Sequence, residues 1–192
     1  MLHNSVQNVK RYFWMYNRRM RILGIDPGFA RVGWALLENR NLKLEARNFG
    51  CIETSKTIRS EERLVDVYKQ VSSLIKKYKP DVLAIEELFF TNNAKTAFKV
   101  GEARGVIILA GAIKKIPVFS YTPLQVKIAV TGYGNAGKGQ VGRMIKAILK
   151  LKEIPKIDDI ADAIAVALTH AFTNKKLNFK LRVRESVHID IM

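Results

Sequence analysis

The sequence is short of the features that mark secreted and membrane proteins. It has one cysteine, Cys51, so the chain forms no internal disulfide, as is usual for proteins of reducing compartments. Its apolar runs are shorter than the roughly 18 residues of a membrane-spanning helix, and its first residues lack the apolar core of a secretory signal. We therefore expect a cytoplasmic protein without a membrane segment.

Acidic residues are also scarce. Asp and Glu number 17 against 33 Lys and Arg, which gives a net charge of +16 at pH 7. Hydrophobic residues form 48% of the chain, which is enough for a packed core and excludes a wholly disordered protein. A folded domain with this charge typically binds a polyanion such as nucleic acid. A ribosome-associated protein without chemistry, or a Lys-rich surface of thermophilic type, would carry the same charge.

The length of 192 residues suits one domain. We expect this domain to occupy residues 20–174, between two basic extensions. Residues 1–19 carry four basic residues and no acid, and we interpret them as a flexible arm or as the product of an upstream start codon. Residues 175–192 carry five basic and two acidic residues, and they would add a strand or lie loosely on nucleic acid.

Hydrophobic periodicity predicts the order of the secondary structure. Three apolar segments separated by short turns predict an antiparallel meander, and helices alternating with strands follow it. The run Val82–Ile85 is continuously apolar, as in a strand covered on both faces. This order predicts an α/β domain with a mixed five-stranded sheet flanked by helices. The predicted strands are 21–25, 32–37, 42–52, 82–85 and 118–121, and the predicted helices are 61–79, 93–115, 123–130, 140–151 and 158–173.

Four acidic residues stand at positions that need an explanation. Asp26 and Glu86 each end an apolar strand, and sites in α/β sheets form at strand ends. Asp159 and Asp162 are three residues apart, so they share one face of a helix that is otherwise apolar nearly all round. A carboxylate buried in such a place without a partner is costly. These side chains therefore need a compensating charge.

Each position also has an ordinary structural interpretation. Asp26 belongs to an Asp-Pro-Gly turn, Glu86 can form a salt bridge, and Asp159 can cap its helix. As a group, the four acids either pair with Lys or Arg, or bind divalent cations, which prefer oxygen ligands. Two such ions about 3.5–4 Å apart can activate a water and stabilise the leaving oxygen during phosphodiester cleavage.

Three segments of the chain resemble the RuvC-type Holliday junction resolvases. They are ILGIDPGFARVGWALLE, VLAIEELFFTNNAKTAFKVGEARGVIILA and DDIADAIAVALTH, which follow one another in the family's order between Arg21 and about Thr173. The resemblance implies a ribonuclease-H-like fold and a homodimer that makes paired, metal-dependent nicks in four-way DNA junctions during recombination and repair. It also implies a branch-migration motor as a further partner.

The resemblance implies the composition of the catalytic site. The site would hold two Mg²⁺ ions, or Mn²⁺ in their place, and would leave 5′-phosphate and 3′-hydroxyl ends. The family's four catalytic acids fall on Asp26, Glu86, Asp159 and Asp162. These are the same four acids that their positions in the sequence had singled out.

The resemblance also implies residues that contact DNA. The family's basic residues near the cut strand fall on Lys127 and Lys138, and an aromatic side chain at the junction centre falls on Phe89. A lysine there would neutralise charge on the transferring phosphate or anchor the backbone, and an exposed ring would stack on a base. Glycines surround Lys138 in the sequence, so we expect this lysine to be held loosely.

Other interpretations stay open. The stretch GYGNAGK at residues 132–138 matches the start of a phosphate-binding loop, but Gly139 replaces the Ser or Thr that would bind Mg²⁺, which argues against an ATPase. His3, His170 and His188 are too scattered for a zinc site. The alternatives to a junction resolvase are a non-catalytic nucleic-acid-binding protein of the same fold and a related ribonuclease-H-like nuclease that acts on RNA.

Overall fold

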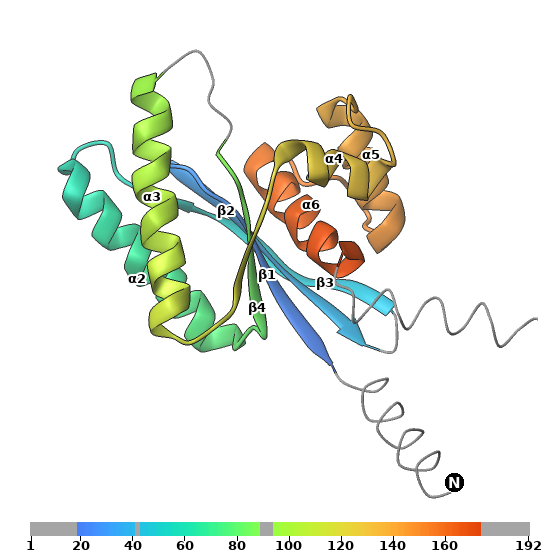
Figure 1. Ribbon diagram of the computed structural model, residues 1–192, viewed down its shortest axis with the longest axis horizontal. Helices are drawn as coiled ribbons and strands as arrows, with labels where there is room; N and C mark the ends of the chain where they lie inside the picture. Colours follow the sequence, from blue (N-terminus) through green and yellow to red (C-terminus); the bar gives the residue numbers. More distant parts are fainter. Residues whose placement is uncertain (1–18, 41–42, 89–93, 174–192) are drawn as a thin grey trace, which may run out of the picture.

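A mixed five-stranded sheet forms the centre of the molecule, with helices on both faces (Figure 1). The computed structural model describes residues 19–40, 43–88 and 94–173. The strand order is β3-β2-β1-β4-β5, in which the first three strands run antiparallel and β4 and β5 run parallel to β1. The strands are β1 (Met20–Asp26), β2 (Arg31–Arg40), β3 (Lys43–Glu53), β4 (Val82–Glu86) and β5 (Val118–Tyr121).

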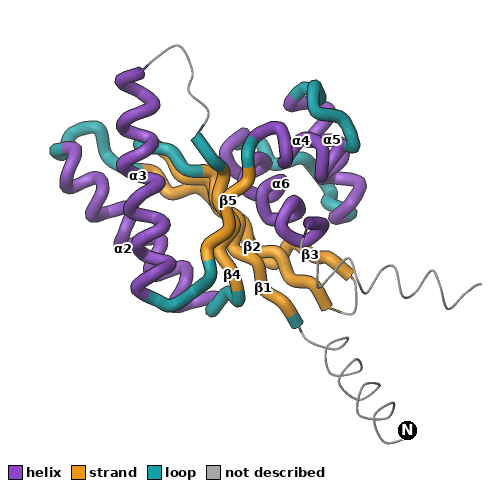
Figure 2. Tube along the Cα trace, viewed as in Figure 1, coloured by secondary structure: helices purple, strands orange, loops and turns teal. Residues whose placement is uncertain are grey.

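The helices divide between the two faces of the sheet. Helices α2 and α3 cover one face, and α4, α5 and α6 cover the other (Figures 1 and 2). None of the helices in the described part of the chain is long and apolar enough to cross a membrane. The helices are α2 (Ser60–Tyr78), α3 (Ala94–Ile113), α4 (Pro123–Thr131), α5 (Lys138–Leu149) and α6 (Asp158–Thr173).

Midway along the adjacent strands β1 and β4, large side chains point to one face of the sheet and small ones to the other. Leu23 and Ile25 of β1 pack into the core under α2 and α3, and Leu83 and Ile85 of β4 join them. The alternating positions between them are small and face α6, because successive side chains of a strand point to opposite faces. This asymmetry lets α6 lie close to the sheet.

Two strand glycines make the approach of α6 possible. A Cβ added at Gly24 of β1 would overlap the carbonyl oxygen of Ala163 and lie 2.7 Å from the Cβ of Ala167. A Cβ added at Gly33 of β2 would overlap the carbonyl oxygen of Asp159. The backbone of α6 therefore rests directly on β1 and β2, a contact that only glycine allows.

The structure confirms the predicted mixed sheet and its flanking helices, with shifts at element ends. The clearest shift concerns α5, which begins at Lys138 rather than at Gln140, with Gly137 as its N-cap residue. Lys138 thus belongs to the first turn of a helix, and its assignment to a glycine-rich loop is wrong, although its side chain is 74% exposed. At the N-terminal boundary, Arg19 forms an ion pair with Glu38, a carboxylate that is only 1% exposed. Residues 1–18 and 174–192, which include most of both predicted extensions, lie outside the described residues.

The contact at Gly24 leads to a stability prediction. We expect Gly24→Ala to lower the free energy of unfolding by about 1–3 kcal/mol, because the added methyl group overlaps backbone atoms of α6 that cannot move aside. Gly139→Ala is the matched control, since its Cβ would meet only the end of the Arg143 side chain at 3.5 Å, and we expect it to change stability by less than about 0.5 kcal/mol. Urea denaturation of both variants measures the difference, and equal stabilities would contradict the close packing of α6.

A buried histidine leads to a prediction on acid stability. His170 of α6 is 2% exposed, its Nδ1 lies 2.7 Å from the Tyr121 hydroxyl, and burial lowers its pKa to about 4. Between pH 6.5 and 4 the unfolded chain therefore binds a proton that the folded protein does not, so this contribution to stability is lost as the pH falls through that range. Between pH 7.5 and pH 4, the free energy of unfolding of His170→Gln should fall by about 2–3 kcal/mol less than that of the wild type. Urea denaturation across this pH range measures the difference. Parallel stability curves for the two proteins would show that His170 does not titrate as inferred.

Candidate active site

The strand register places Asp26 and Glu86 side by side. Strands β1 and β4 are parallel neighbours in which Ile25 pairs with Ile85, and the two acids are the next residue of each strand. Both isoleucines point into the core under α2 and α3, so the alternation of side chains turns both acids toward α6. Two acids that are 60 positions apart in the chain thus become neighbours at one end of the sheet.

Helix α6 brings the other two acids to the same end of the sheet. Its first turn lies against β2, because the carbonyl oxygen of Asp159 occupies the space that a side chain at Gly33 would need. Gly33 is in turn the antiparallel partner of Asp26. Asp162 follows Asp159 by about one helical turn, so both carboxylates face the strand ends. We call the set Asp26, Glu86, Asp159 and Asp162 the carboxylate cluster.

The electrostatics of the carboxylate cluster show that its members influence one another. Burial, followed by the negative charges of Glu86, Asp162 and Asp159, raises the pKa of Asp26 to about 8. Burial and the charge of Asp162 raise the pKa of Glu86 to about 7, although a hydrogen bond with Asp26 and the charges of Lys138 and Lys127 act in the opposite direction. Burial also raises the pKa of Asp162. The folded protein therefore holds negative charge here at a cost, and a cation would relieve it.

Lys138 supplies part of the compensating charge. Its Nζ lies 3.6 Å from Oδ2 of Asp162 and 3.4 Å from Oδ2 of Asp158, and the nearby acids, above all Asp162, raise its pKa. The first turn of a helix disfavours a cation, because the helix dipole is positive there, so the acids of α6 offset a local cost. Lys127, on α4, is near enough to lower the pKa of Glu86. Both predicted lysines thus lie beside the carboxylate cluster.

Arg31 is a site residue that the sequence analysis missed. It opens β2, and its Nε lies 3.0 Å from Oδ2 of Asp159. That oxygen is buried and accepts no hydrogen bond from any described residue. Arg31 and Asp159 therefore form an ion pair in which no N–H group of Arg31 is aligned for a hydrogen bond. Gly24 and Gly33 were also missed, although a glycine inside an apolar strand signals a close approach of another backbone. No comparable signal in the sequence marks Arg31.

The cluster has the chemistry of a site for hard divalent cations. Four carboxylates supply only oxygen ligands, the kind that Mg²⁺ and Mn²⁺ prefer. The pKa values of Glu86 and Asp26 are about 7 and 8, and a buried oxygen of Asp159 accepts no hydrogen bond although it faces Arg31, so oxygen atoms free to bind a cation are present. As the side chains stand, however, no three His, Cys, Asp or Glu residues within the described ranges are arranged to hold a metal ion. Asp159 and Asp162 instead point to Arg31 and Lys138.

The structure thus brings together six of the seven residues that the sequence analysis assigned to the site. The seventh, Phe89, lies outside the described residues, which break off after Leu88 and resume at Ala94. Cys51 lies near the cluster, because burial and then the charge of Asp159 raise the pKa of its thiol. Asp158, next to Asp159 in the chain, is exposed and contacts only Lys138 among the site residues.

Comparison with known proteins connects this arrangement to one family. The model of the family described as crossover junction endodeoxyribonuclease RuvC matches residues 22–170. The proteins of that name from Caldicellulosiruptor saccharolyticus and Halothermothrix orenii are 48% and 50% identical to this chain. Each alignment covers 84% of this chain, with 98% and 97% of the respective relative.

Solved structures show the same fold. Thermus thermophilus RuvC in complex with a Holliday junction substrate superposes with a TM-score of 0.77 at 36% identity, over 81% of this chain and 95% of the other. The yeast mitochondrial Holliday junction resolvase Ydc2 superposes with a TM-score of 0.62 at 16% identity, over 88% of this chain and 86% of the other, and it supports the fold alone. The ribonuclease-H-like fold predicted from the sequence is therefore confirmed.

The matched region begins at β1 and ends within α6, so it contains all four members of the carboxylate cluster. Nearly the whole length of each curated relative is aligned, so the likeness is not confined to the acidic segments. The chain therefore belongs to the RuvC family of crossover junction endodeoxyribonucleases.

Proposed function

We propose that this protein resolves four-way DNA junctions by cutting the phosphodiester backbone at the carboxylate cluster. Membership in the RuvC family supports a metal-dependent endonuclease that acts in recombination and repair. The observation that carries the assignment of the site is the meeting of four separated acids at one end of the sheet, where burial and mutual repulsion raise the pKa of Asp26 to about 8. A purely structural cluster would instead pair each acid with a base.

The cluster would bind two Mg²⁺ ions, with Mn²⁺ as a possible substitute. When bound, these ions would activate a water molecule and neutralise charge on the scissile phosphate. Asp26 would lie centrally in this arrangement, because it interacts with all three other acids. Asp159 would release Arg31, and Asp162 would release Lys138, to bind the metal ions instead. The freed side chains of Arg31 and Lys138 would then stand beside the approaching phosphate.

The two predicted lysines would act on the DNA. Lys138 would donate hydrogen bonds to a phosphate oxygen of the cut strand once Asp162 turns to the metal, and Lys127 would reduce the negative potential that opposes the strand. Phe89 would stack on a base at the junction centre, as the resemblance implies. We further expect the protein to act in the cytoplasm. A branch-migration motor stays a predicted partner.

A symmetric dimer would place two such sites on one junction. The helix α3 is the candidate interface, because Phe98, Leu109 and Ile113 are more than half exposed on it. Gly105 on the same helix has open space where its side chain would be, so a second backbone can approach closely. A twofold axis through this helix would let the two sites nick two opposing strands.

The site assignment predicts the behaviour of two variants. Asp26→Asn and Asp162→Asn should each lower the rate of cutting a synthetic four-way junction in Mg²⁺ by more than about 100-fold, because each removes a metal ligand. Junction binding measured by gel shift should persist, since positive charge supplies the affinity. Strand-specific labels should show nicks in two opposing strands of the wild-type reaction.

Glu87→Gln is the matched control, because Glu87 is exposed and directly follows Glu86 in the chain. It should cut at close to the wild-type rate. Junction binding without cutting by the wild-type protein would favour a non-catalytic binding module, and cutting of RNA in place of the junction would favour the related ribonuclease. Undiminished cutting by Asp26→Asn would disprove the role of the carboxylate cluster.

The raised pKa of Asp26 leads to a prediction on stability without metal. The folded protein binds a proton at Asp26 more tightly than the unfolded chain does, so stability falls as the pH rises from about 4 to about 8. In a chelator, Asp26→Asn should therefore have a higher Tm than the wild type, and the difference should grow with pH. Added Mg²⁺ should stabilise the wild type more than the variant.

Glu87→Gln is again the control, because Glu87 is exposed and stands outside the cluster. It should show no pH-dependent gain in Tm. A wild-type Tm that is insensitive to both pH and Mg²⁺ would contradict the predicted electrostatic cost of the cluster. Differential scanning fluorimetry from pH 5 to pH 9 gives all of these values.

A further inference from the structure

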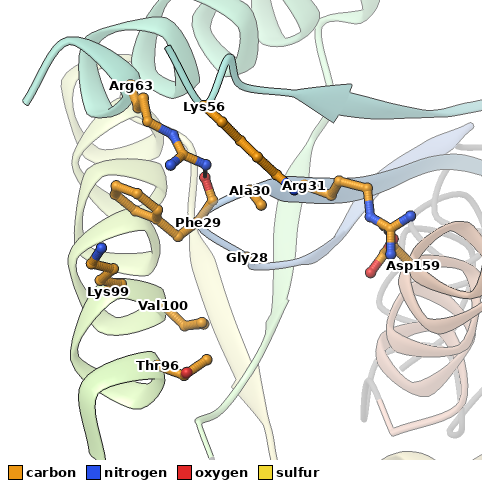
Figure 3. Close-up of a pocket in the computed structure, with 10 residues that line it drawn as sticks. All are labelled: Gly28, Phe29, Ala30, Arg31, Lys56, Arg63, Thr96, Lys99, Val100 and Asp159. Carbon is orange, nitrogen blue, oxygen red and sulfur yellow. Dashed lines mark hydrogen bonds and ion pairs between the residues drawn. The ribbon is translucent and has the colours of Figure 1, made fainter. Parts of the chain in front are cut away.

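A basic cavity lies beside the carboxylate cluster, and no role described so far uses most of its residues. Its volume is about 530 Å³, and it is an open cavity lined by the turn between β1 and β2, the start of β2, the turn before α2, the first turn of α2, the first two turns of α3, and Asp159 (Figure 3). Four of the side chains that line it are cations, and one is an acid. The cations are Arg31, Lys56, Arg63 and Lys99. We call this cavity the basic pocket.

The inner wall of the basic pocket is fixed by contacts around Phe29. The guanidinium of Arg63 lies 4.2 Å from the centre of the Phe29 ring, and its Nε donates a hydrogen bond of 2.9 Å to Oγ1 of Thr54. The Nζ of Lys99 lies 5.3 Å from the centre of the same ring, which Figure 3 shows between the two cations. Phe29 itself is 7% exposed. The charges of Arg63 and Lys99 therefore stand against a packed wall, and Lys56 faces them from the turn before α2.

The charge of the basic pocket is not compensated within the described protein. Lys56, Arg63 and Lys99 have no acidic partner within ion-pair distance among the described residues, although Arg59, between Lys56 and Arg63 in the chain, pairs with Glu62. Lys56 and Lys99 are exposed, so both can reach a ligand. Three uncompensated cations around one cavity repel one another, and an anion bound there would relieve the repulsion.

The basic pocket is continuous with the carboxylate cluster. Arg31 spans the two, because it lines the pocket and its Nε lies 3.0 Å from Oδ2 of Asp159. Figure 3 shows Lys56 extending across the pocket toward Arg31, and Arg31 extending onward to Asp159. An anion in the pocket and a phosphate at the cluster would therefore be near neighbours. A DNA strand provides this pair, because its phosphates recur at each nucleotide.

We propose that the basic pocket binds a backbone phosphate of the cleaved DNA strand, next to the scissile phosphate, through Lys56 and Lys99. The proposal rests on the proposed function, since it assumes that the scissile phosphate lies at the carboxylate cluster. Arg63 holds the wall of the pocket, and Arg31 connects it to Asp159. The contact carries no base information, so it adds affinity and sets the position of the strand without sequence preference.

The first test compares two double variants of equal charge. Lys56→Ala/Lys99→Ala should bind a four-way junction more weakly than the wild type. In a plot of the logarithm of the association constant against the logarithm of the salt concentration, its slope should be smaller in magnitude by about 2, which is about 1 for each lysine. Between 50 and 200 mM salt the wild type should then lose roughly ten times more affinity than the variant. Fluorescence anisotropy with an Asp26→Asn background in all proteins measures this without cutting.

Lys76→Ala/Lys114→Ala is the matched control. Both residues are exposed lysines without an ion pair among the described residues. Lys76 lies in the last turn of α2 and Lys114 directly follows α3, so they precede the starts of β4 and β5, and Asp26 lies at the opposite end of the sheet. This control should keep the wild-type slope to within about 0.5. Equal losses of slope in the two double variants would mean that Lys56 and Lys99 act only through general charge, which overturns the proposal.

The second test locates the phosphate. Neutral methylphosphonates are introduced one at a time into the cut strand around the scissile position. The wild type should lose affinity at one neighbouring position, and Lys56→Ala/Lys99→Ala should lose nothing further there while it still responds at the other positions. Full sensitivity of the double variant at every position would exclude a specific phosphate contact.

The outcomes separate this proposal from the proposed function. A wild-type protein that binds but does not cut junctions refutes the proposed function, whatever the pocket variants do. A wild type that cuts, together with pocket variants that cut and bind like the control, refutes only the pocket. Competition by free inorganic phosphate at millimolar concentration, with no positional effect of methylphosphonates, would identify a site for a free anion instead and would also overturn the proposal.

Discussion

The contact between α6 and the sheet is the constraint on which the candidate site depends. Gly24 and Gly33 leave room for the backbone of the helix, and carbonyl oxygens of Ala163 and Asp159 occupy the space that side chains would need. Without this contact, Asp159 would stand away from the ends of β1 and β4, and the acids of α6 would be surface charges. With it, two acids from a helix and two from parallel strands share one half-buried corner. The contact that packs α6 on the sheet therefore also assembles the site.

This assembly costs stability, and the structure shows how the cost is managed. Burial and neighbouring negative charge raise the pKa of Asp26 and Glu86 to about 8 and 7, and within the described ranges Arg31 and Lys138 are the cations paired with the acids of α6. A protein selected only for stability would replace such a cluster with apolar side chains. The retained charge is understandable if a metal ion and a phosphate complete the site. Strain of this kind is typical of functional sites.

The distribution of positive charge is as informative as its total. The net charge of +16 indicates a polyanionic partner but does not say where the partner lies. The structure separates cations that have acidic partners, such as Arg59 and Arg47, from those of the basic pocket, where three have none among the described residues. The pocket adjoins the carboxylate cluster through Arg31 and Asp159. The unpaired positive charge of the basic pocket thus adjoins the carboxylate cluster, where the proposed DNA strand would pass.

The sequence by itself determined the class of fold, the order of its elements and the four acids. Apolar runs ended by Asp26 and Glu86, and an apolar helix interrupted by Asp159 and Asp162, are local patterns, and local patterns survive without tertiary information. The start of α5 at Lys138 was misplaced, because glycines at its N-terminus resemble a loop and the acids of α6 that favour a lysine there are 20 or more positions away. The positions of Arg31, Lys56 and Lys99 around one pocket were decided only by the tertiary structure, since no local pattern in the sequence distinguishes a basic residue beside a cavity from one on open surface. What joins them is contact between β2, the turn before α2, and α3, which no spacing along the chain encodes.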